Sequence, residues 1–160
     1  METVEQEPAI PAAPIVALDL GAKRVGVAVS DALSISITRL DALVRTNWKQ
    51  MLRDVNDLLQ RFDARTVVIG LPLKLDGSAG DAALAVRRLA ENFARSLTVP
   101  VYLQDERLSS VAAEENLRAE SRRPEEVSAL VDSEAAALIL RDFLQGDQER
   151  ILVSAPRQTL

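Results

Sequence analysis

Residues 15–30, IVALDLGAKRVGVAVS, carry the clearest strand pattern of this chain. They hold two apolar runs, Ile15–Leu20 and Val25–Ser30, and the short polar segment Ala22–Arg24 between them is typical of a tight turn. A third, less regular run spans Ile35–Val44. Three closely spaced runs of this kind predict an antiparallel meander of three strands.

After the meander, the spacing of the apolar residues changes from that of strands to that of helices. Apolar residues recur at helical spacing over Trp48–Phe62 and Val86–Leu97. The runs Thr66–Gly70 and Val99–Leu103 are short and apolar, as in buried parallel strands. Each of these two runs follows a helical segment, which is the pattern of β-α-β crossovers.

The last third of the chain is expected to be mainly helical. We expect a short helix over Val111–Leu117, a basic loop over Arg118–Pro124, and a final helix that Asp132 opens and Gly146 ends. The order β-β-β-α-β-α-β-α-α predicts an α/β protein with a five-stranded mixed sheet and helices on both faces. The sheet would combine the three-strand antiparallel meander with two parallel strands, which is the ribonuclease-H-like order.

The composition limits the chemistry that the chain can perform. Among its 160 residues, 48% are hydrophobic and 27% charged, which fits one ordinary globular domain. There is no cysteine and no histidine, so thiolate or imidazole zinc sites, cysteine nucleophiles and serine–histidine triads are excluded. Any metal must be held by oxygen, which favours Mg²⁺, Mn²⁺ or Ca²⁺.

Three segments are expected along the chain. Residues 1–14 are acidic and rich in proline and are expected to form a disordered tail, residues 15–146 the domain, and residues 147–160 a second tail with the short apolar stretch Ile151–Val153. No apolar run approaches the roughly 20 residues that span a bilayer, and the first residues lack a signal-peptide pattern. We therefore expect a cytoplasmic protein without a membrane partner.

Acidic residues fall where the predicted sheet would bring them together. Asp19 lies near the end of the first strand, Asp105 and Glu106 end the fifth, and Asp132 opens the last helix. Because side chains alternate along a strand, only one of Asp105 and Glu106 can face Asp19. Carboxylates that converge repel each other unless a cation lies between them, and two divalent ions held in this way can promote hydrolysis of a phosphodiester.

Each of these acids also has an ordinary structural interpretation. Asp19 precedes the turn residue Gly21 and could simply form the turn. Asp132 has the sequence context of a helix N-cap, and Glu106 could be a surface charge at a strand end. The pattern of acidic residues alone leaves both interpretations open.

At these same residues the sequence resembles a known family. Residues Asp19–Asp31 resemble the opening motif of the YqgF/RuvX family, which comprises Holliday-junction-resolvase-like proteins described as nucleases for the 5′ end of pre-16S ribosomal RNA. Three further segments resemble family motifs in the same order: Gly70–Pro72 with Asp76–Gly77 after it, Asp105–Ser110, and Asp132–Leu140. The resemblance covers about residues 15–145.

The resemblance implies a divalent-metal-dependent nuclease of the ribonuclease-H-like fold. Its catalytic, metal-holding carboxylates would be Asp19, Glu106 and Asp132, which leaves Asp105 on the wrong face. The cofactor would be Mg²⁺ or Mn²⁺, as two ions. The substrate would be structured RNA or branched DNA, such as a Holliday junction, bound by a monomer or a homodimer.

Basic residues at turns and element ends are candidates for phosphate contacts. They are Lys23, Arg24, Lys74, Arg107, Arg122 and Arg123. The alternative is that they are solvated surface charges. Lys74 stands where relatives often have asparagine, so the resemblance gives it no role.

Two other functional classes remain open. The net charge of −5 counts against a protein that coats nucleic acid through a general positive field, but a non-catalytic protein associated with nucleic acid or ribosomes is an alternative. The sequence Asp19-Leu20-Gly21 with Gly26 after it also resembles the phosphate loop of actin-like ATP-binding proteins. That class needs two such domains, and this chain has the length of one.

Overall fold

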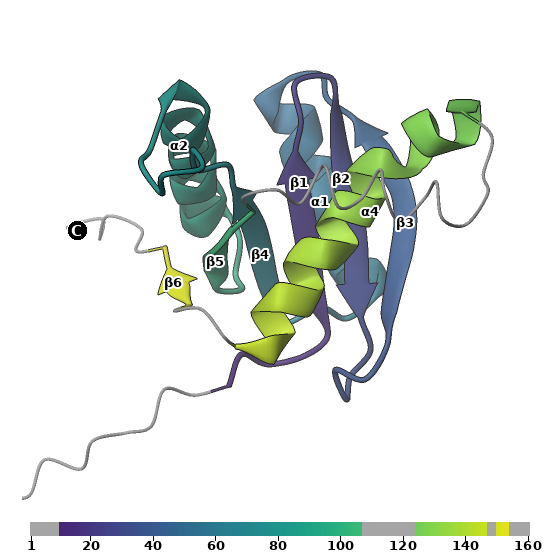
Figure 1. The fold of residues 1–160 in the computed structure, drawn as a ribbon. Coiled ribbons are helices and arrows are strands. Elements are labelled where there is room, and N and C mark those ends of the chain that lie inside the picture. Colours follow the sequence, from purple (N-terminus) through teal and green to yellow (C-terminus); the bar gives the residue numbers. More distant parts are fainter. Residues whose placement is uncertain (1–9, 107–123, 147–149, 154–160) are drawn as a thin grey trace, which may run out of the picture.

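The computed structural model describes residues 10–106, 124–146 and 150–153, and the described side chains of the last helix begin at Ser133. One mixed sheet with the strand order β3-β2-β1-β4-β5-β6 forms the centre of the fold (Figure 1). The strands are β1 (Ile15–Leu20), β2 (Arg24–Ser30), β3 (Ile37–Val44), β4 (Thr66–Leu71), β5 (Val101–Asp105) and β6 (Ile151–Leu152). The helices are α1 (Trp48–Arg61), α2 (Asp81–Ser96) and α4 (Pro124–Gln145).

The strand pairing confirms most of the expected topology. Strands β1, β2 and β3 form the antiparallel meander, β4 pairs in parallel with β1, and β5 pairs in parallel with β4. The expected count of five strands is wrong, because β6 pairs antiparallel with β5 and the Val153 N–H donates to the Val101 carbonyl at 2.9 Å. A strand of two residues is too short to show a period in the sequence. It is recognised only by its backbone hydrogen bonds with β5.

The ends of the expected domain also contact the sheet. The hydroxyl of Thr66 donates to the Ala12 carbonyl at 2.7 Å, and the Arg65 N–H donates to the Pro14 carbonyl at 2.8 Å. Residues 12–14 are therefore held against the start of β4, while the first nine residues of the expected tail lie outside the described part. At the other end, the guanidinium of Arg150 donates to the Phe143 carbonyl in the last turn of α4.

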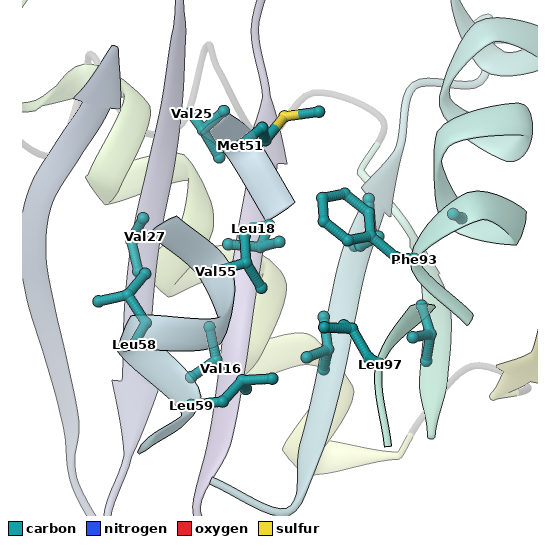
Figure 2. Packing of buried hydrophobic residues seen from close by; sticks show 14 of the residues in the cluster. Val16, Leu18, Val25, Val27, Met51, Val55, Leu58, Leu59, Phe93 and Leu97 are labelled. Atoms are coloured by element: carbon teal, nitrogen blue, oxygen red, sulfur yellow. The ribbon is translucent and has the colours of Figure 1, made fainter. Parts of the chain in front are cut away.

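Helices α1 and α2 cover one face of the sheet, as expected for helices on both faces. Figure 2 shows Val55, Leu58 and Leu59 of α1 pointing toward β1 and β2. The N-terminus of α1 is capped by Asn47, whose side chain accepts a hydrogen bond from Gln50 N–H at 2.9 Å. From α2, Phe93 enters the same cluster.

The opposite face is covered by α4, which crosses β1 and β2 in Figure 1. Apolar side chains of the helix pack on small and branched residues of the sheet. The helix contributes Ala136, Ile139, Leu140 and Phe143, and the strands contribute Ile15, Ala17, Ala28 and Val68.

The start of α4 corrects one expectation. The helix begins at Pro124 and not at Asp132, which lies inside it. Proline suits the first helical position because its φ is fixed and it lacks an N–H. The expected helix over Val111–Leu117 and most of the expected loop lie outside the described residues. Within the described part of the chain, no helix is both long and apolar enough to cross a membrane.

Candidate active site

The side chains of Asp19 and Glu106 meet at one edge of the sheet. Strands β1, β4 and β5 are parallel, so their C-terminal ends lie at the same edge. Asp19 follows the alternation of Ile15 and Ala17 and therefore faces α4. The Glu106 N–H donates to the Leu71 carbonyl at 3.1 Å, which fixes the residue after β5 to the end of β4. A hydrogen bond joins the two carboxyl groups.

Glycine 70 makes room for this pair. Leu18 is in register with Ile69, which places Gly70 beside Asp19 on the neighbouring strand. A Cβ atom on Gly70 would lie 2.5 Å from Glu106 Oε2 and 2.4 Å from Ile139 Cδ1. Because both distances are shorter than any real contact of a Cβ atom, the Glu106 carboxyl occupies space that only glycine leaves free.

The surroundings of Glu106 favour its neutral form. Burial raises the pKa of the Glu106 carboxyl from 4.5 to about 9, and the charge of Asp19, the hydrogen bond with Asp19 and the charge of Asp105 act in the same direction. Without a bound cation, Glu106 therefore favours its protonated form near neutral pH, and its hydrogen bond with Asp19 places that proton between the two carboxyl groups. A proton holds together two groups that would otherwise repel.

Comparison with known proteins shows the family of this chain. The family model RuvX, described as Holliday junction resolvase, matches residues 13–146. The chain belongs to this family. A protein of Synechococcus elongatus is 36% identical over 132 residues, which is 82% of this chain and 89% of that protein. One of Gloeothece citriformis is 39% identical over 135 residues, 84% of this chain and 88% of that protein. Both carry the name "Putative pre-16S rRNA nuclease".

A solved structure shows the same fold at much lower sequence similarity. It is described as T. thermophilus RuvC in complex with Holliday junction substrate, and it superposes with a TM-score of 0.54 at 18% identity. The match covers 86% of this chain and 98% of that one. The expected α/β architecture and the resemblance to the RuvX family are thus both confirmed.

The structure describes two of the three expected carboxylates of this RuvX-family protein as neighbours. The third, Asp132, lies on α4, and its side chain is outside the described part. Among the described residues no group of three metal-ligating side chains occurs. Asp105 is half-exposed and, by alternation, follows Leu103 toward the α1 and α2 face.

Three of the basic candidates lie at the same edge of the sheet. Lys23 is exposed in the turn after β1, Arg24 is exposed at the start of β2, and Lys74 is exposed in the loop after β4. The aliphatic part of Lys74 covers Gly80, at the N-cap of α2. The other three candidates, Arg107, Arg122 and Arg123, lie outside the described residues.

Two polar features of the site escaped the sequence analysis. Arg45, at the end of β3, donates from Nη1 to the Gly21 carbonyl at 2.8 Å and so holds the turn that follows Asp19. Ser133 and Glu134, directly after Asp132, contact strands β2 and β3. The sequence held no signal for these contacts. It did hold one for the space beneath Glu106, because an isolated glycine such as Gly70 in a strand of β-branched residues often marks the close approach of another group.

Proposed function

We propose that this chain is a divalent-metal-dependent nuclease that hydrolyses phosphodiester bonds of structured RNA or branched DNA. The observation that carries the proposal is the contact between the carboxyl groups of Asp19 and Glu106, where burial, together with the charge and hydrogen bond of Asp19, raises the pKa of Glu106 to about 9. The names of the family and of its relatives support the same chemistry and point to two substrates, the precursor of 16S ribosomal RNA and the Holliday junction. A precursor-RNA nuclease would act in the cytoplasm.

The residues present fit a divalent cation. Carboxylate oxygens are the ligands that Mg²⁺ and Mn²⁺ prefer. The carboxyl groups of Asp19 and Glu106 share one proton. A divalent cation in its place would bring two positive charges instead of one and would allow both groups to ionise. We propose that Asp19 and Glu106 hold the cation together with Asp132, and that two ions bind. When bound, the ions would supply Lewis-acid activation of the phosphodiester and of the attacking water.

The chain itself would position these groups, and metal binding would release a proton from the site. The ends of β1 and β4 fix Asp19 and Glu106, and Gly70 leaves the space that Glu106 fills. Because Glu106 is protonated without a cation, metal binding must release its proton. The exposed cations Lys23, Arg24 and Lys74 would contact substrate phosphates, and we assign the same role to Arg107, Arg122 and Arg123.

A cleavage assay tests the proposal. The full chain is incubated with RNA that carries the 5′ leader of 16S ribosomal RNA, or with a four-way DNA junction, in Mn²⁺, in Mg²⁺ and in EDTA. We expect cleavage with metal and none in EDTA. Asp19→Asn should lower the rate about 1,000-fold, the scale seen when one electrostatic group leaves an active site. The matched control is Asp57→Asn on the exposed side of α1, which should cleave normally.

The outcomes separate the alternatives. Equal cleavage in EDTA and in Mn²⁺, or an active Asp19→Asn variant, would contradict the proposal. Binding of either nucleic acid without cleavage in any metal would instead favour the non-catalytic alternative. Neither monomer nor homodimer is assumed, so the assay is run across a range of protein concentrations.

A further inference from the structure

The edge strand β3 makes directional contacts with the turn of α4 that contains Asp132. Arg39 of β3 forms an ion pair with Glu134, in which Arg39 Nη1 donates to Glu134 Oε2. Only 11% of the Glu134 side chain is exposed, so the pair is largely removed from water on the helix side. These two residues are far apart in the sequence, and the contact fixes helix and strand relative to each other.

Ser133 adds a second contact at an irregularity of the sheet. Its hydroxyl donates to the Leu40 carbonyl at 2.5 Å and accepts from the Val27 N–H at 3.5 Å. Between β2 and β3 the register shifts, because Val25 pairs with Leu43 whereas Val27 pairs with Leu40. A bulge of this kind disrupts the ladder of backbone hydrogen bonds, and the Ser133 hydroxyl bridges the two strands there.

The remaining contacts of α4 are of a different kind. From Ala136 to Phe143 the helix packs through apolar side chains, which resist separation but depend little on direction. Hydrogen bonds and ion pairs weaken steeply when a helix rotates or slides. Among the described side chains of α4, Ser133 and Glu134 are the nearest in sequence to Asp132, so their contacts set the rotation of that turn.

We propose that Arg39 is a positioning residue for the metal site. Through its ion pair with Glu134, and together with the Ser133 hydroxyl, it fixes the helical turn of Asp132 relative to the Asp19–Glu106 pair. The inference rests on the proposed function, because it takes Asp132 as the third carboxylate of the site. Arg39 itself lies on the edge strand and does not need to touch substrate or metal.

The test measures Mn²⁺ binding and stability as well as cleavage. In Arg39→Gln, we expect the Mn²⁺ concentration for half-saturation, measured by calorimetry, to rise about tenfold, as is typical when an outer contact of a metal ligand is lost. The matched control is Arg141→Gln on the same helix, whose pair with Asp142 is exposed. That variant should bind Mn²⁺ within about twofold of the native protein, because exposed pairs contribute little.

A double variant distinguishes positioning from a purely structural role. Arg39→Met with Glu134→Leu leaves no unpaired buried charge, so the melting temperature should recover relative to Arg39→Gln. If positioning is the role, weak Mn²⁺ binding persists in the double variant. Recovery of both stability and Mn²⁺ affinity would overturn the inference.

The single variant and the proposed function can fail separately. Native Mn²⁺ affinity and cleavage in Arg39→Gln, with Asp19→Asn inactive, would overturn the inference and leave the proposed function standing. An active Asp19→Asn variant would contradict the proposed function itself.

Discussion

The two faces of the sheet bury different chemistry, although the same strands form both. On the face under α1 and α2, Val16 and Leu18 of β1 join a cluster of buried side chains that is entirely hydrophobic. On the α4 face, the same strand presents Ile15 and Ala17, and then Asp19 at its C-terminal end. Alternation thus lets one strand supply the core with one set of residues and the candidate site with the other.

Both faces bury large side chains, with Phe93 on one and Phe143 on the other, and they differ in the residues around Asp19. Large side chains such as Phe93 fill the α1 and α2 face, where its ring contacts that of Trp48 with centroids 4.8 Å apart. Toward the site, the α4 face has Gly26 and Gly70 on the strands that flank Asp19. The α4 face therefore combines a packed core with room for charged groups at the C-terminal end of β1.

The largest expected effect on stability comes from the apolar face. Phe93→Ala should lower the free energy of unfolding by about 3–5 kcal/mol, because it removes a fully buried aromatic side chain and leaves a cavity. Urea unfolding measures the loss. The Mn²⁺ affinity of the folded variant should stay near the native value. A parallel fall in Mn²⁺ affinity would show that the faces are not independent.

A smaller effect is expected at the glycine beneath Glu106. Gly70→Ala should lower the free energy of unfolding by about 1–3 kcal/mol, because its Cβ atom would overlap Glu106 and Ile139. It should also weaken Mn²⁺ binding, because the Glu106 carboxyl must move. Thermal melts with EDTA and with Mn²⁺ measure both.

The matched control for Gly70 is Gly80→Ala. There the added Cβ atom would meet the flexible end of Lys74, which can move away, so the cost should be about 1 kcal/mol or less, mainly from the helix N-cap. Equal losses in stability and Mn²⁺ affinity at the two glycines would contradict the role given to Gly70.

The last expected effect is a pH dependence of the metal-free protein. The folded pKa of Glu106, about 9, lies above its ordinary value of 4.5, so the folded state binds the extra proton between these values. Its contribution to stability is fully present below about pH 4.5 and is lost as pH rises through about 9. The slope is at most about 1.4 kcal/mol per pH unit.

Substitution isolates this contribution. The free energy of unfolding is measured by urea in EDTA at a series of pH values. Glu106→Gln should remove its dependence on pH over this range, whereas Glu91→Gln, at an exposed position of α2, should retain it. An unchanged slope in Glu106→Gln would show that Glu106 does not hold the proton.

Periodicity and spacing were enough for much of the fold. They predicted the succession of the first five strands along the chain, the antiparallel meander, the two parallel strands and the helices on both faces, because burial imposes periods of 2 and 3.6 on the sequence. Alternation also singled out Glu106 or Asp105 as the possible neighbour of Asp19, and the family resemblance favoured Glu106. These features depend on local patterns that a single sequence carries.

What the sequence could not predict depends on contacts between distant segments. The start of α4 at Pro124 was missed because Asp132 has the stronger N-cap pattern. The bridge from Ser133 to Val27 and Leu40, and the ion pair of Arg39 with Glu134, join residues that no spacing rule connects. Likewise, the role of Gly70 appears only when Glu106 lies over it.

The short strand β6 has a consequence for self-association. An uncovered strand edge presents unpaired N–H and C=O groups that another chain can pair with. Leu152 and Ile151 cover β5 on that side, and Arg150 ties them to the end of α4 through the Phe143 carbonyl. A chain cut at Gly146, where the pattern of the sequence places the end of the domain, would keep its site and expose the edge of β5. Strand β6 would thus disfavour pairing between the β5 edges of two copies of this chain.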